Sequence, residues 1–234
     1  MRTDWVDVLL VHWPDAATPV EETMHALEEV VASGRARFVG VSNFTGAMLD
    51  ECRRTRRVDV SQVGYHMLDR RQEQETFPYC VANGIGVMGY GSLGHGLLTG
   101  AFTPTTTFDP ARDWRAGGVA FGQPIFRGDN LKTNVGVVER LRREVAEPRG
   151  VPLSQIALAW ALANPAISTA LVGARTPTEV DANDAGAELE LSAAERATID
   201  GILSGVAGRV REFTPLRPAM EPWGQELAPR AAAT

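Results

Sequence analysis

The chain has 234 residues, of which 44% are hydrophobic and 22% charged, so it holds enough apolar material for the core of a globular protein of one or two domains. Its net charge of -6 argues against nucleic acid or an anionic membrane as a partner. No apolar run approaches the roughly 20 residues of a membrane span, and no basic segment precedes the first one. We therefore expect a cytoplasmic protein, with Cys52 and Cys80 reduced and not spaced to bind metal.

The first predicted element is a strand that ends in a histidine. Val6 to Val11 form a nearly continuous apolar run rich in β-branched residues, which is typical of a parallel strand buried on both faces. His12 stands where this run ends. Because parallel α/β folds build their sites at the carboxyl ends of strands, His12 is the first candidate site residue. At this point a core histidine bonded to a backbone carbonyl is the alternative.

Strand and helix signals then alternate along the chain. Further strands are predicted at 38–41, 58–63, 85–90 and 167–172, and helices at 18–33, 45–57, 72–83, 130–147 and 154–163. Capping boxes predict helix starts at Thr18, Thr176 and Ser192. Five strand–helix units in a row, with right-handed crossovers, predict a parallel sheet or part of a (β/α) barrel.

Two segments interrupt this alternation. Residues 91–128 are rich in Gly, Pro and Thr, and a loop of this length inside a domain is usually functional. Its aromatic residues hint at an apolar substrate site: Phe102, Phe108, Trp114, Phe121 and Phe126. Residues 214–234 are predicted to form an irregular tail, which leaves 1–213 as one barrel-like domain. His25 and His95 are both expected to be solvated.

A polar or glycine-containing segment follows each predicted strand. In chain order the five ends read His12, Ser42-Asn43, Gln62 with Tyr65 and His66, Tyr90-Gly91-Ser92, and Gly173-Ala174-Arg175. They offer a proton-transferring ring, amide donors and acceptors, an aromatic face, glycines that allow close approach, and a fixed cation. This combination suits a large cofactor that carries an amide, a planar ring and phosphates.

One motif points to a different fold. Residues 89–94 match G-x-G-x-x-G after a strand, as in a Rossmann fingerprint. That fingerprint requires a helix to open there, so that its N-terminal amides hold the pyrophosphate. Here His95-Gly96 and a Thr/Pro-rich loop follow instead, and the nearest acid at a suitable distance, Asp109, lies in that loop. The Rossmann interpretation is therefore disfavoured.

Five ordered segments together resemble the aldo-keto reductase family, most closely its bacterial and voltage-gated-channel-subunit-like branch. They are LLVHWPD, GRARFVGVSNF, QVGYHMLDR, GIGVMGYGSLGHGLLTG and LVGARTPTEVDAND, and the similarity extends over residues 4–205. The resemblance implies an α/β fold, the (β/α)8 TIM-type barrel. It also implies binding of NADP(H) across the carboxyl-end face, and reduction of small aldehydes or ketones by direct hydride transfer.

The resemblance also assigns roles to individual residues. His12 matches the catalytic histidine that orients the substrate carbonyl, and Tyr90 matches the ring that stacks on the nicotinamide. The residues matched to the rest of the cofactor are Ser42, Asn43 and Gln62 at the carboxamide, Ser92, Leu93, Gly94 and Leu98 over the ribose and pyrophosphate, and Gly173, Arg175, Glu179 and Asn183 at the adenosine phosphate.

The choice between NADP and NAD depends on two of these residues. Arg175, beside a capped helix N-terminus, suits a phosphate and favours NADP (NADPH) over NAD. The carboxylate of Glu179 would repel a 2′-phosphate, unless Glu179 faces the backbone as the third residue of a capping box.

The chain departs from the family at its front. In the family the strand that ends in this histidine is the fourth, so we expect a partial barrel that lacks the first three βα units. With those units go the catalytic Asp, Tyr and Lys; the tyrosine, tuned by the lysine, is the general acid. The family pattern does not place Tyr65 or His66 in that role, and packing or a structural role beside the carboxamide is the favoured interpretation of both.

Five of eight strands would leave two apolar edges open, VDVLLV and AISTALV, and such edges recruit partners. The chain is then a fragment or a mis-started product, a homo-oligomer or subunit that covers its edges by pairing, or a diverged protein. The primary functional hypothesis is an NAD(P)H-dependent carbonyl reductase whose proton donor is absent from this chain. The alternatives are a redox-neutral lyase, isomerase or cyclase that uses His12, alone or together with His66, and a catalytically silent NADP-binding or scaffold subunit.

Overall fold

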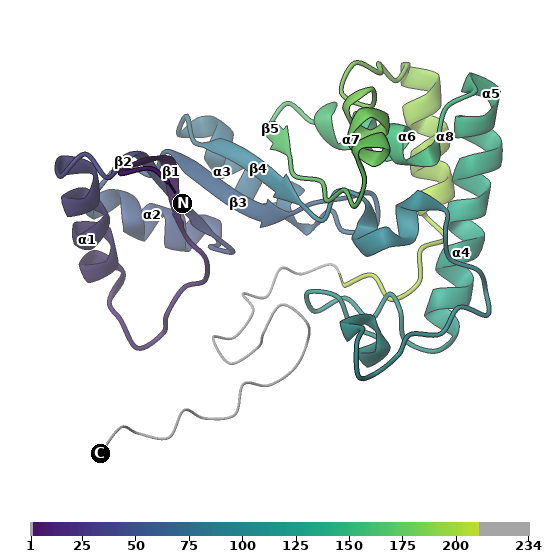
Figure 1. The fold of residues 1–234 in the computed structure, drawn as a ribbon, viewed down its shortest axis with the longest axis horizontal. Helices are drawn as coiled ribbons and strands as arrows, with labels where there is room; N and C mark the ends of the chain where they lie inside the picture. Colours follow the sequence, from purple (N-terminus) through teal and green to yellow (C-terminus); the bar gives the residue numbers. More distant parts are fainter. Residues whose placement is uncertain (1, 211–234) are drawn as a thin grey trace.

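Five parallel strands form one sheet in the order of the chain (Figure 1). The computed structural model describes residues 2–210. Its strands are β1 (Val6–Val11), β2 (Ala36–Ser42), β3 (Val60–Gly64), β4 (Gly86–Tyr90) and β5 (Ile167–Ala170). Each strand pairs with the next one in sequence, so the sheet has no reversal of strand order of the kind that a doubly wound Rossmann sheet requires. The order is that of a stretch of TIM-type barrel.

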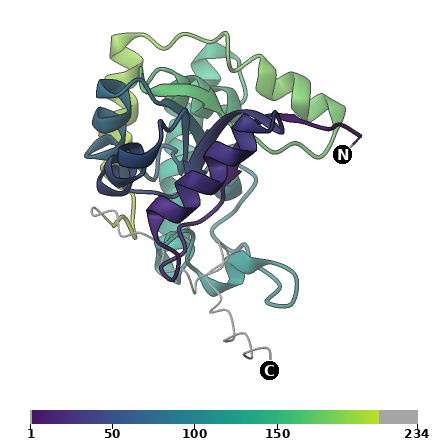
Figure 2. The same cartoon turned by 90° about the vertical axis from the view of Figure 1, so that its left-hand side faces the viewer.

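Helices connect the strands and pack on one another outside the sheet. Those in the first half are α1 (Val20–Ala32), α2 (Gly46–Thr55) and α3 (Thr76–Ala82), the last preceded by the 3-10 turn η1 (Arg71–Glu73). Helix α1 packs on α2 and β2, at the end of the molecule that faces the viewer in Figure 2. Strands β2, β3 and β4 each contribute fully buried valines to the core: Val39 and Val41 from β2, Val63 from β3 and Val87 from β4.

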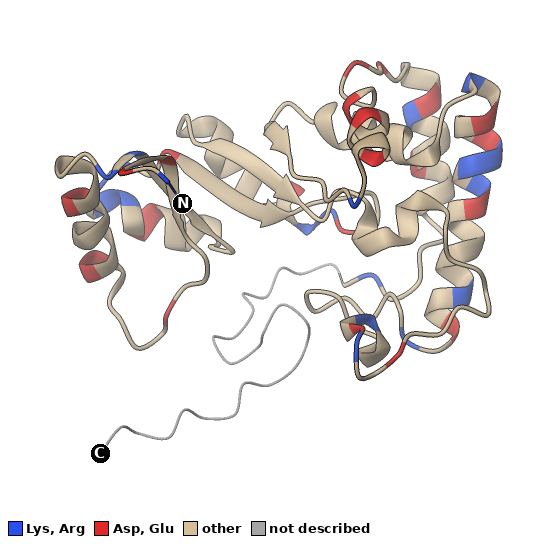
Figure 3. Cartoon of the chain, in the orientation of Figure 1, with Lys and Arg blue, Asp and Glu red and all other residues tan. Residues whose placement is uncertain are grey.

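The second half follows the long loop after β4, which contains the 3-10 segments η2 (Gly94–Thr99) and η3 (Trp114–Gly117). Its helices are α4 (Asp129–Leu141), the π-helical η4 (Arg142–Ala146), α5 (Glu147–Arg149), α6 (Leu153–Leu162), α7 (Pro177–Asp184) and α8 (Ala193–Leu203). Along α4 and α5, Lys and Arg are interspersed with Asp and Glu (Figure 3). Among the described residues, no helix has the length and apolarity needed to cross a membrane.

The expectation that the first strand is buried on both faces is wrong. No residue of β1 is buried; the strand alternates between half-buried and exposed positions, and Leu9 is 38% exposed. On the neighbouring strand, Phe38 is 52% exposed. The reason is that β1 is an edge strand, paired only with β2 among the described residues, as β5 is paired only with β4. The two apolar edges expected from the sequence are therefore the edges of this sheet.

Two predicted helix starts also need correction. The Thr18 hydroxyl donates to Asp15, 2.8 Å away, and α1 begins at Val20 after Pro19 with no side-chain cap. Thr176 does cap α7, but the Glu179 carboxylate accepts the amide of Arg175, one position before the expected one. The capping box at Ser192 is complete. The predicted tail, 214–234, and the end of the predicted domain at 213 lie outside the described residues.

Candidate functional site

Asn43 joins the ends of three strands, β1, β2 and β4. Its side-chain nitrogen donates to the backbone oxygen of His12 and to the Ser42 hydroxyl, each 3.0 Å away. Its side-chain oxygen accepts a hydrogen bond of 2.7 Å from the hydroxyl of Tyr90. Asn43 has a left-handed φ of 65°, which Asn tolerates better than most residues. The structure therefore brings His12, Ser42, Asn43 and Tyr90 together, as the strand ends predicted.

Tyr90 and Gln62 lie on the same face of the sheet as Ser42. Ser42 pairs with Gln62 and Gly64 pairs with Tyr90, and residues paired in register or two apart along a strand share a face. A Cβ atom on Gly64 would lie only 3.2 Å from the ring of Tyr90, so the glycine lets this ring rest on the backbone of β3. Burial raises the pKa of Tyr90 above its ordinary value. Gln62 makes one weak contact, 4.0 Å from its Nε2 to the sulfur of Met88.

His12 is exposed, which excludes the alternative of a core histidine. Its ring lies 5.5 Å from that of Trp13, and within residues 2–210 no side chain forms a hydrogen bond with it. The network described above holds its backbone carbonyl, so the position of the residue is fixed while the imidazole stays accessible.

A pocket of about 650 Å³ opens beside this group, between the loops that follow β4 and β5. A pocket of this volume is large enough for a cofactor. It brings together six of the predicted cofactor residues: Ser92, Leu93, Gly173, Arg175, Glu179 and Asn183. Gly94 and Leu98 are buried and do not line it. A Cβ atom on Gly94 would meet Leu98 at 3.1 Å, so these two residues shape the turn beneath the pocket.

Arg175 and Glu179 form an ion pair at the mouth of this pocket. The Arg175 guanidinium lies 2.7 Å from the Glu179 carboxylate, which also accepts the Arg175 amide at 2.7 Å. The hydrogen bonds from Arg175 lower the pKa of Glu179. The Arg175 side chain is 89% exposed, so it can exchange this partner for a phosphate. Ser92 closes the other side by bonding the carbonyls of Gly89 and Leu171, at 3.2 and 3.3 Å.

A buried ionic cluster that the sequence did not predict lies behind the strand ends. Asp69 and Arg71 form a bidentate pair at 2.7 and 2.9 Å, and both side chains are 7% exposed. Although burial opposes it, the Arg71 guanidinium holds the pKa of Asp69 below its usual value. His66 lies beside this pair, and burial lowers its pKa to about 4. The segment Asp69-Arg70-Arg71 after a strand end was the available signal.

The expectation that His95 is solvated is wrong. Its ring stacks on Phe121 with centroids 5.1 Å apart, and contacts Trp114 and His66 edge-on at 5.4 and 5.2 Å. Burial lowers its pKa to about 3. The physical reason is the run of left-handed φ values at Gly94, His95 and Gly96, which turns the chain inward. His25 is exposed, as expected.

The aromatic residues of the long loop have two different roles. Phe108 packs on Phe102 and Phe126, with ring centroids 5.3 and 5.6 Å away, and Arg115 lies over the rings of Phe102 and Phe108. These three rings form a small core of the loop, and Phe102 is the one of the three that also lines the pocket. Phe121, in contrast, reaches the strand ends, 5.1 Å from the ring of Tyr90.

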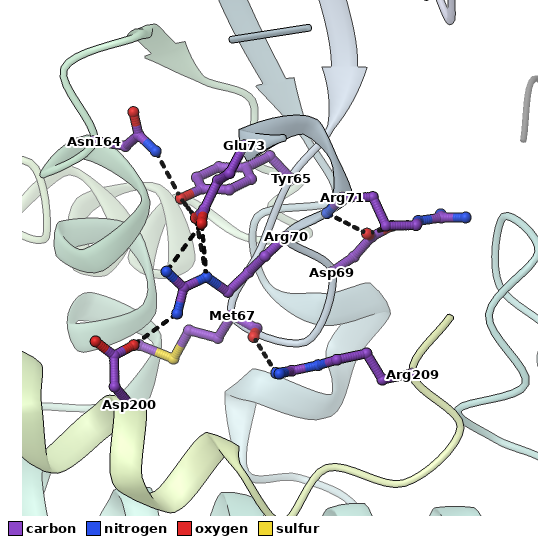
Figure 4. Close-up of polar contacts among 9 residues, drawn as sticks. All are labelled: Tyr65, Met67, Asp69, Arg70, Arg71, Glu73, Asn164, Asp200 and Arg209. Atoms are coloured by element: carbon purple, nitrogen blue, oxygen red, sulfur yellow. Dashed lines mark hydrogen bonds and ion pairs between the residues drawn. The ribbon is translucent and has the colours of Figure 1, made fainter. Parts of the chain in front are cut away.

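Tyr65 faces the helices and not the strand-end site (Figure 4). Its hydroxyl donates to Glu73 at 2.7 Å and accepts from Asn164 at 3.0 Å, and its ring stacks on Trp160. Glu73 in turn binds Arg70, which reaches Asp200 on α8 at 2.6 Å. Burial raises the pKa of Tyr65. This confirms the interpretation of Tyr65 as a packing residue.

Comparison of the chain with known proteins identifies a family and several relatives. Residues 1–204 match the Aldo/keto reductase family. An aldo-keto reductase of Bacillus subtilis is 34% identical over 78% of this chain and 53% of its own. The NADH-specific methylglyoxal reductase of Escherichia coli is 31% identical over 82% of this chain and 57% of its own. A probable voltage-gated potassium channel subunit beta of Arabidopsis thaliana is 31% identical over 77% of this chain and 56% of its own.

A solved structure also resembles this chain. The glycerol dehydrogenase of Gluconobacter oxydans superposes with a TM-score of 0.81 at 29% identity, over 91% of this chain and 63% of that one. The chain spans about half the length of the curated relatives it matches.

Proposed function

Because this chain belongs to the aldo/keto reductase family, we propose that it supplies the cofactor-binding part of an NAD(P)H-dependent oxidoreductase that reduces a small aldehyde or ketone. The observation that carries the proposal is the meeting of His12, Ser42, Asn43 and Tyr90 at one rim, next to a pocket of about 650 Å³ with a cation at its mouth. When bound, the coenzyme supplies the hydride.

The residues at the rim fit a nicotinamide in the chemistry of their side chains. Ser42, Asn43 and Gln62 are hydrogen-bonding groups suited to a carboxamide, and Tyr90 offers an aromatic ring. The pocket is lined by Ser92 and Leu93 from the loop after β4 and by Gly173, Arg175, Glu179 and Asn183 from the segment after β5. Gly94 and Leu98 take part by supporting the turn from below. In this proposal the exposed imidazole of His12 orients the substrate carbonyl.

The proposal extends to the architecture. We assign β1 to the place of the fourth strand in a (β/α)8 barrel, with three further units and the family's Asp, Tyr and Lys contributed from outside these 234 residues. The greater length of the relatives and the open edges of β1 and β5 support this assignment. Residues 1–213 then form one barrel-like unit, 214–234 a separate irregular tail, and a second copy of the chain is a candidate to cover the edges in a cytoplasmic homo-oligomer.

We assign NADP as the preferred coenzyme and NAD as the weaker one, because Arg175 is exposed and can bind a 2′-phosphate. Glu179 works against this preference, and one relative is named as NADH-specific. The relative strength of these two side chains therefore decides coenzyme choice.

A second candidate function is a silent coenzyme-binding subunit. The channel-subunit relative favours it, and so does the orientation of Tyr65, which turns away from the rim. A redox-neutral enzyme that uses His12 as acid or base is the third candidate. His66 is a poor helper for it, because His66 is 3% exposed and burial holds its pKa at about 4.

Coenzyme titration and turnover together separate these functions. We expect NADPH to bind, and turnover with small aldehydes to require it and to be lost in His12→Ala. His25→Ala is the matched control, since His25 is exposed on α1, where its ring lies beside Glu21 and Glu28 of the same helix. Binding without turnover would indicate a silent subunit. Turnover without coenzyme would indicate redox-neutral chemistry, and no binding of either coenzyme would refute the proposal.

A further inference from the structure

The pocket and the nicotinamide-type residues are separated from each other. The pocket is lined at its inner end by Gly91 and His95, and none of Ser42, Asn43, Gln62 and Tyr90 lines it. Asn43, Tyr90 and Phe121 instead line a second cavity, of about 10 Å³, which is room for about one water molecule. An extended ligand in the pocket therefore meets a barrier before it reaches Tyr90.

Phe121 forms this barrier together with His95. Its ring stacks on His95, with centroids 5.1 Å apart and planes inclined by 17°. The same ring lies 5.1 Å from that of Tyr90 and is stacked at 6.5 Å on Trp13, the residue that follows His12. A single aromatic side chain thus fills the space among Tyr90, Trp13 and His95.

The backbone that carries Phe121 is held in an unfavourable conformation. Ala120 and Gln123 exchange two backbone hydrogen bonds of 2.8 Å, and the two residues between them, Phe121 and Gly122, have φ values of 48° and 80°. Positive φ at both central positions is the pattern of a type I′ turn, which favours Asn or Gly and disfavours a bulky residue. Such strain persists only where the surrounding structure enforces it.

Arg71 supplies part of that enforcement. Its guanidinium donates to the carbonyl of Phe121 at 2.9 Å while its bidentate pair with Asp69 holds it in place. The buried ion pair, which the proposed mechanism does not use, thereby anchors the tip of the turn to the segment behind β3.

From this geometry we infer that Phe121 is a gating residue: its ring occupies the stacking place in front of Tyr90, and it must leave before a nicotinamide ring can be seated there. The inference rests on the proposed function, because it takes Tyr90 as the stacking ring. It predicts that the part of the coenzyme beyond the nicotinamide can bind with the gate closed, and that the ring can bind only with the gate open.

Removing the ring while keeping the turn tests this inference. Phe121→Gly and Phe121→Asn both suit the left-handed φ, so the turn is retained. The binding of NADPH and NADH is compared with that of the ADP-ribose fragments, with and without the 2′-phosphate, that lack nicotinamide. Phe108→Ala is the matched control, because Phe108 lies in the same loop and packs on Phe102 and Phe126.

We expect both Phe121 variants to bind the favoured whole coenzyme about tenfold more tightly than the parent chain, the factor that corresponds to an open fraction of about one tenth. Binding of the fragments should not change, and Phe108→Ala should match the parent in both measurements.

Equal or weaker binding of the whole coenzyme in both variants would show that Phe121 is a wall of the site, and would overturn the inference alone. An equal gain in affinity for the whole coenzyme and for the fragment would also overturn it, because the fragment has no nicotinamide ring to be admitted. If neither coenzyme nor fragment binds to any variant, the proposed function fails and the gate fails with it.

Discussion

The hydroxyl of Tyr90 donates a hydrogen bond of 2.7 Å to the side-chain oxygen of Asn43, which links the end of β4 to the end of β2 across β3. This bond fixes the orientation of the Asn43 amide, whose nitrogen is then directed at His12 and Ser42. The three non-glycine residues with left-handed φ in the described part of the chain are Asn43, His95 and Phe121, and all three belong to this neighbourhood. Backbone strain is concentrated where the proposed chemistry takes place.

Two substitutions of Asn43 distinguish what its hydrogen bonds contribute to stability from what its backbone conformation costs. Asn43→Ala should lower the free energy of unfolding by about 1–3 kcal/mol, because the half-buried Tyr90 hydroxyl loses its acceptor. Asn43→Gly removes the same bonds but accepts the φ of 65°, so it should be about 1 kcal/mol less damaging. Urea unfolding of both variants measures the difference; equal losses would show that the conformation carries no cost.

Acid should destabilise the fold through His66. In the folded protein its pKa is about 4, below the value of about 6.5 in an unfolded chain, so the unfolded state takes up a proton first as the pH falls. The stability that neutral His66 supports is complete above pH 6.5 and is lost between about pH 6.5 and 4. The loss is on the order of 3 kcal/mol, at 1.36 kcal/mol for each unit of pKa shift.

His66→Asn provides the test, because Asn can accept the bond that the Leu68 amide donates to Nδ1 of His66. Urea unfolding at pH 7 and at pH 4.5 should show a weaker pH dependence for this variant than for the parent. His25→Asn, at an exposed position, should leave the dependence unchanged. An identical pH dependence in all three proteins would contradict the assignment to His66.

Tyr65→Phe should affect stability and leave coenzyme binding intact. The change removes the hydroxyl that bridges Glu73 and Asn164, so we expect a loss of about 1–3 kcal/mol in the free energy of unfolding. Its ring contacts with Trp160 and Phe77 are retained. A changed coenzyme affinity with unchanged stability would instead place Tyr65 in the site.

The ion pair at the pocket mouth should control coenzyme choice. Glu179→Gln removes the negative charge beside Arg175 while keeping a hydrogen-bond acceptor for the Arg175 amide. The ratio of NADPH to NADH affinity should then rise severalfold, because the carboxylate no longer repels a 2′-phosphate. Arg175→Gln should lower this ratio, because the guanidinium that attracts a 2′-phosphate is lost. Glu195→Gln, which alters the capping box of α8, is the control. A ratio that none of these changes moves would exclude this pair from phosphate recognition.

The exposed edge should drive association of the isolated chain. Phe38 is 52% exposed on β2, next to the edge strand β1. Phe38→Lys should reduce the mass observed by sedimentation, because a charge disfavours burial of this surface in an interface. Val81→Lys introduces the same charge on α3, where Val81 is 62% exposed, and should have no effect. A monomeric parent chain would refute the association.

Much of the fold was accessible from the sequence, because apolar runs and capping residues report local structure. The five strands, their parallel arrangement and the meeting of Asn43 with Tyr90 follow from strand ends that share one edge. The exposure of β1 was not accessible in this way, since an apolar run does not reveal whether anything covers it. The inward position of His95 depends on left-handed φ values within a loop. Likewise, the contact of Arg71 with Phe121 spans 50 residues, which no local pattern encodes.

Pairing of each strand with its predecessor has a consequence for biosynthesis. The first four strands can associate as they emerge from the ribosome, because no partner among them lies far ahead in the chain. His12, Ser42, Asn43 and Tyr90 all precede Phe121 in the chain, so their strands can pair before the turn that bears Phe121 folds. In that order of events the rim forms first, uncovered, and the aromatic cover is added to it afterwards.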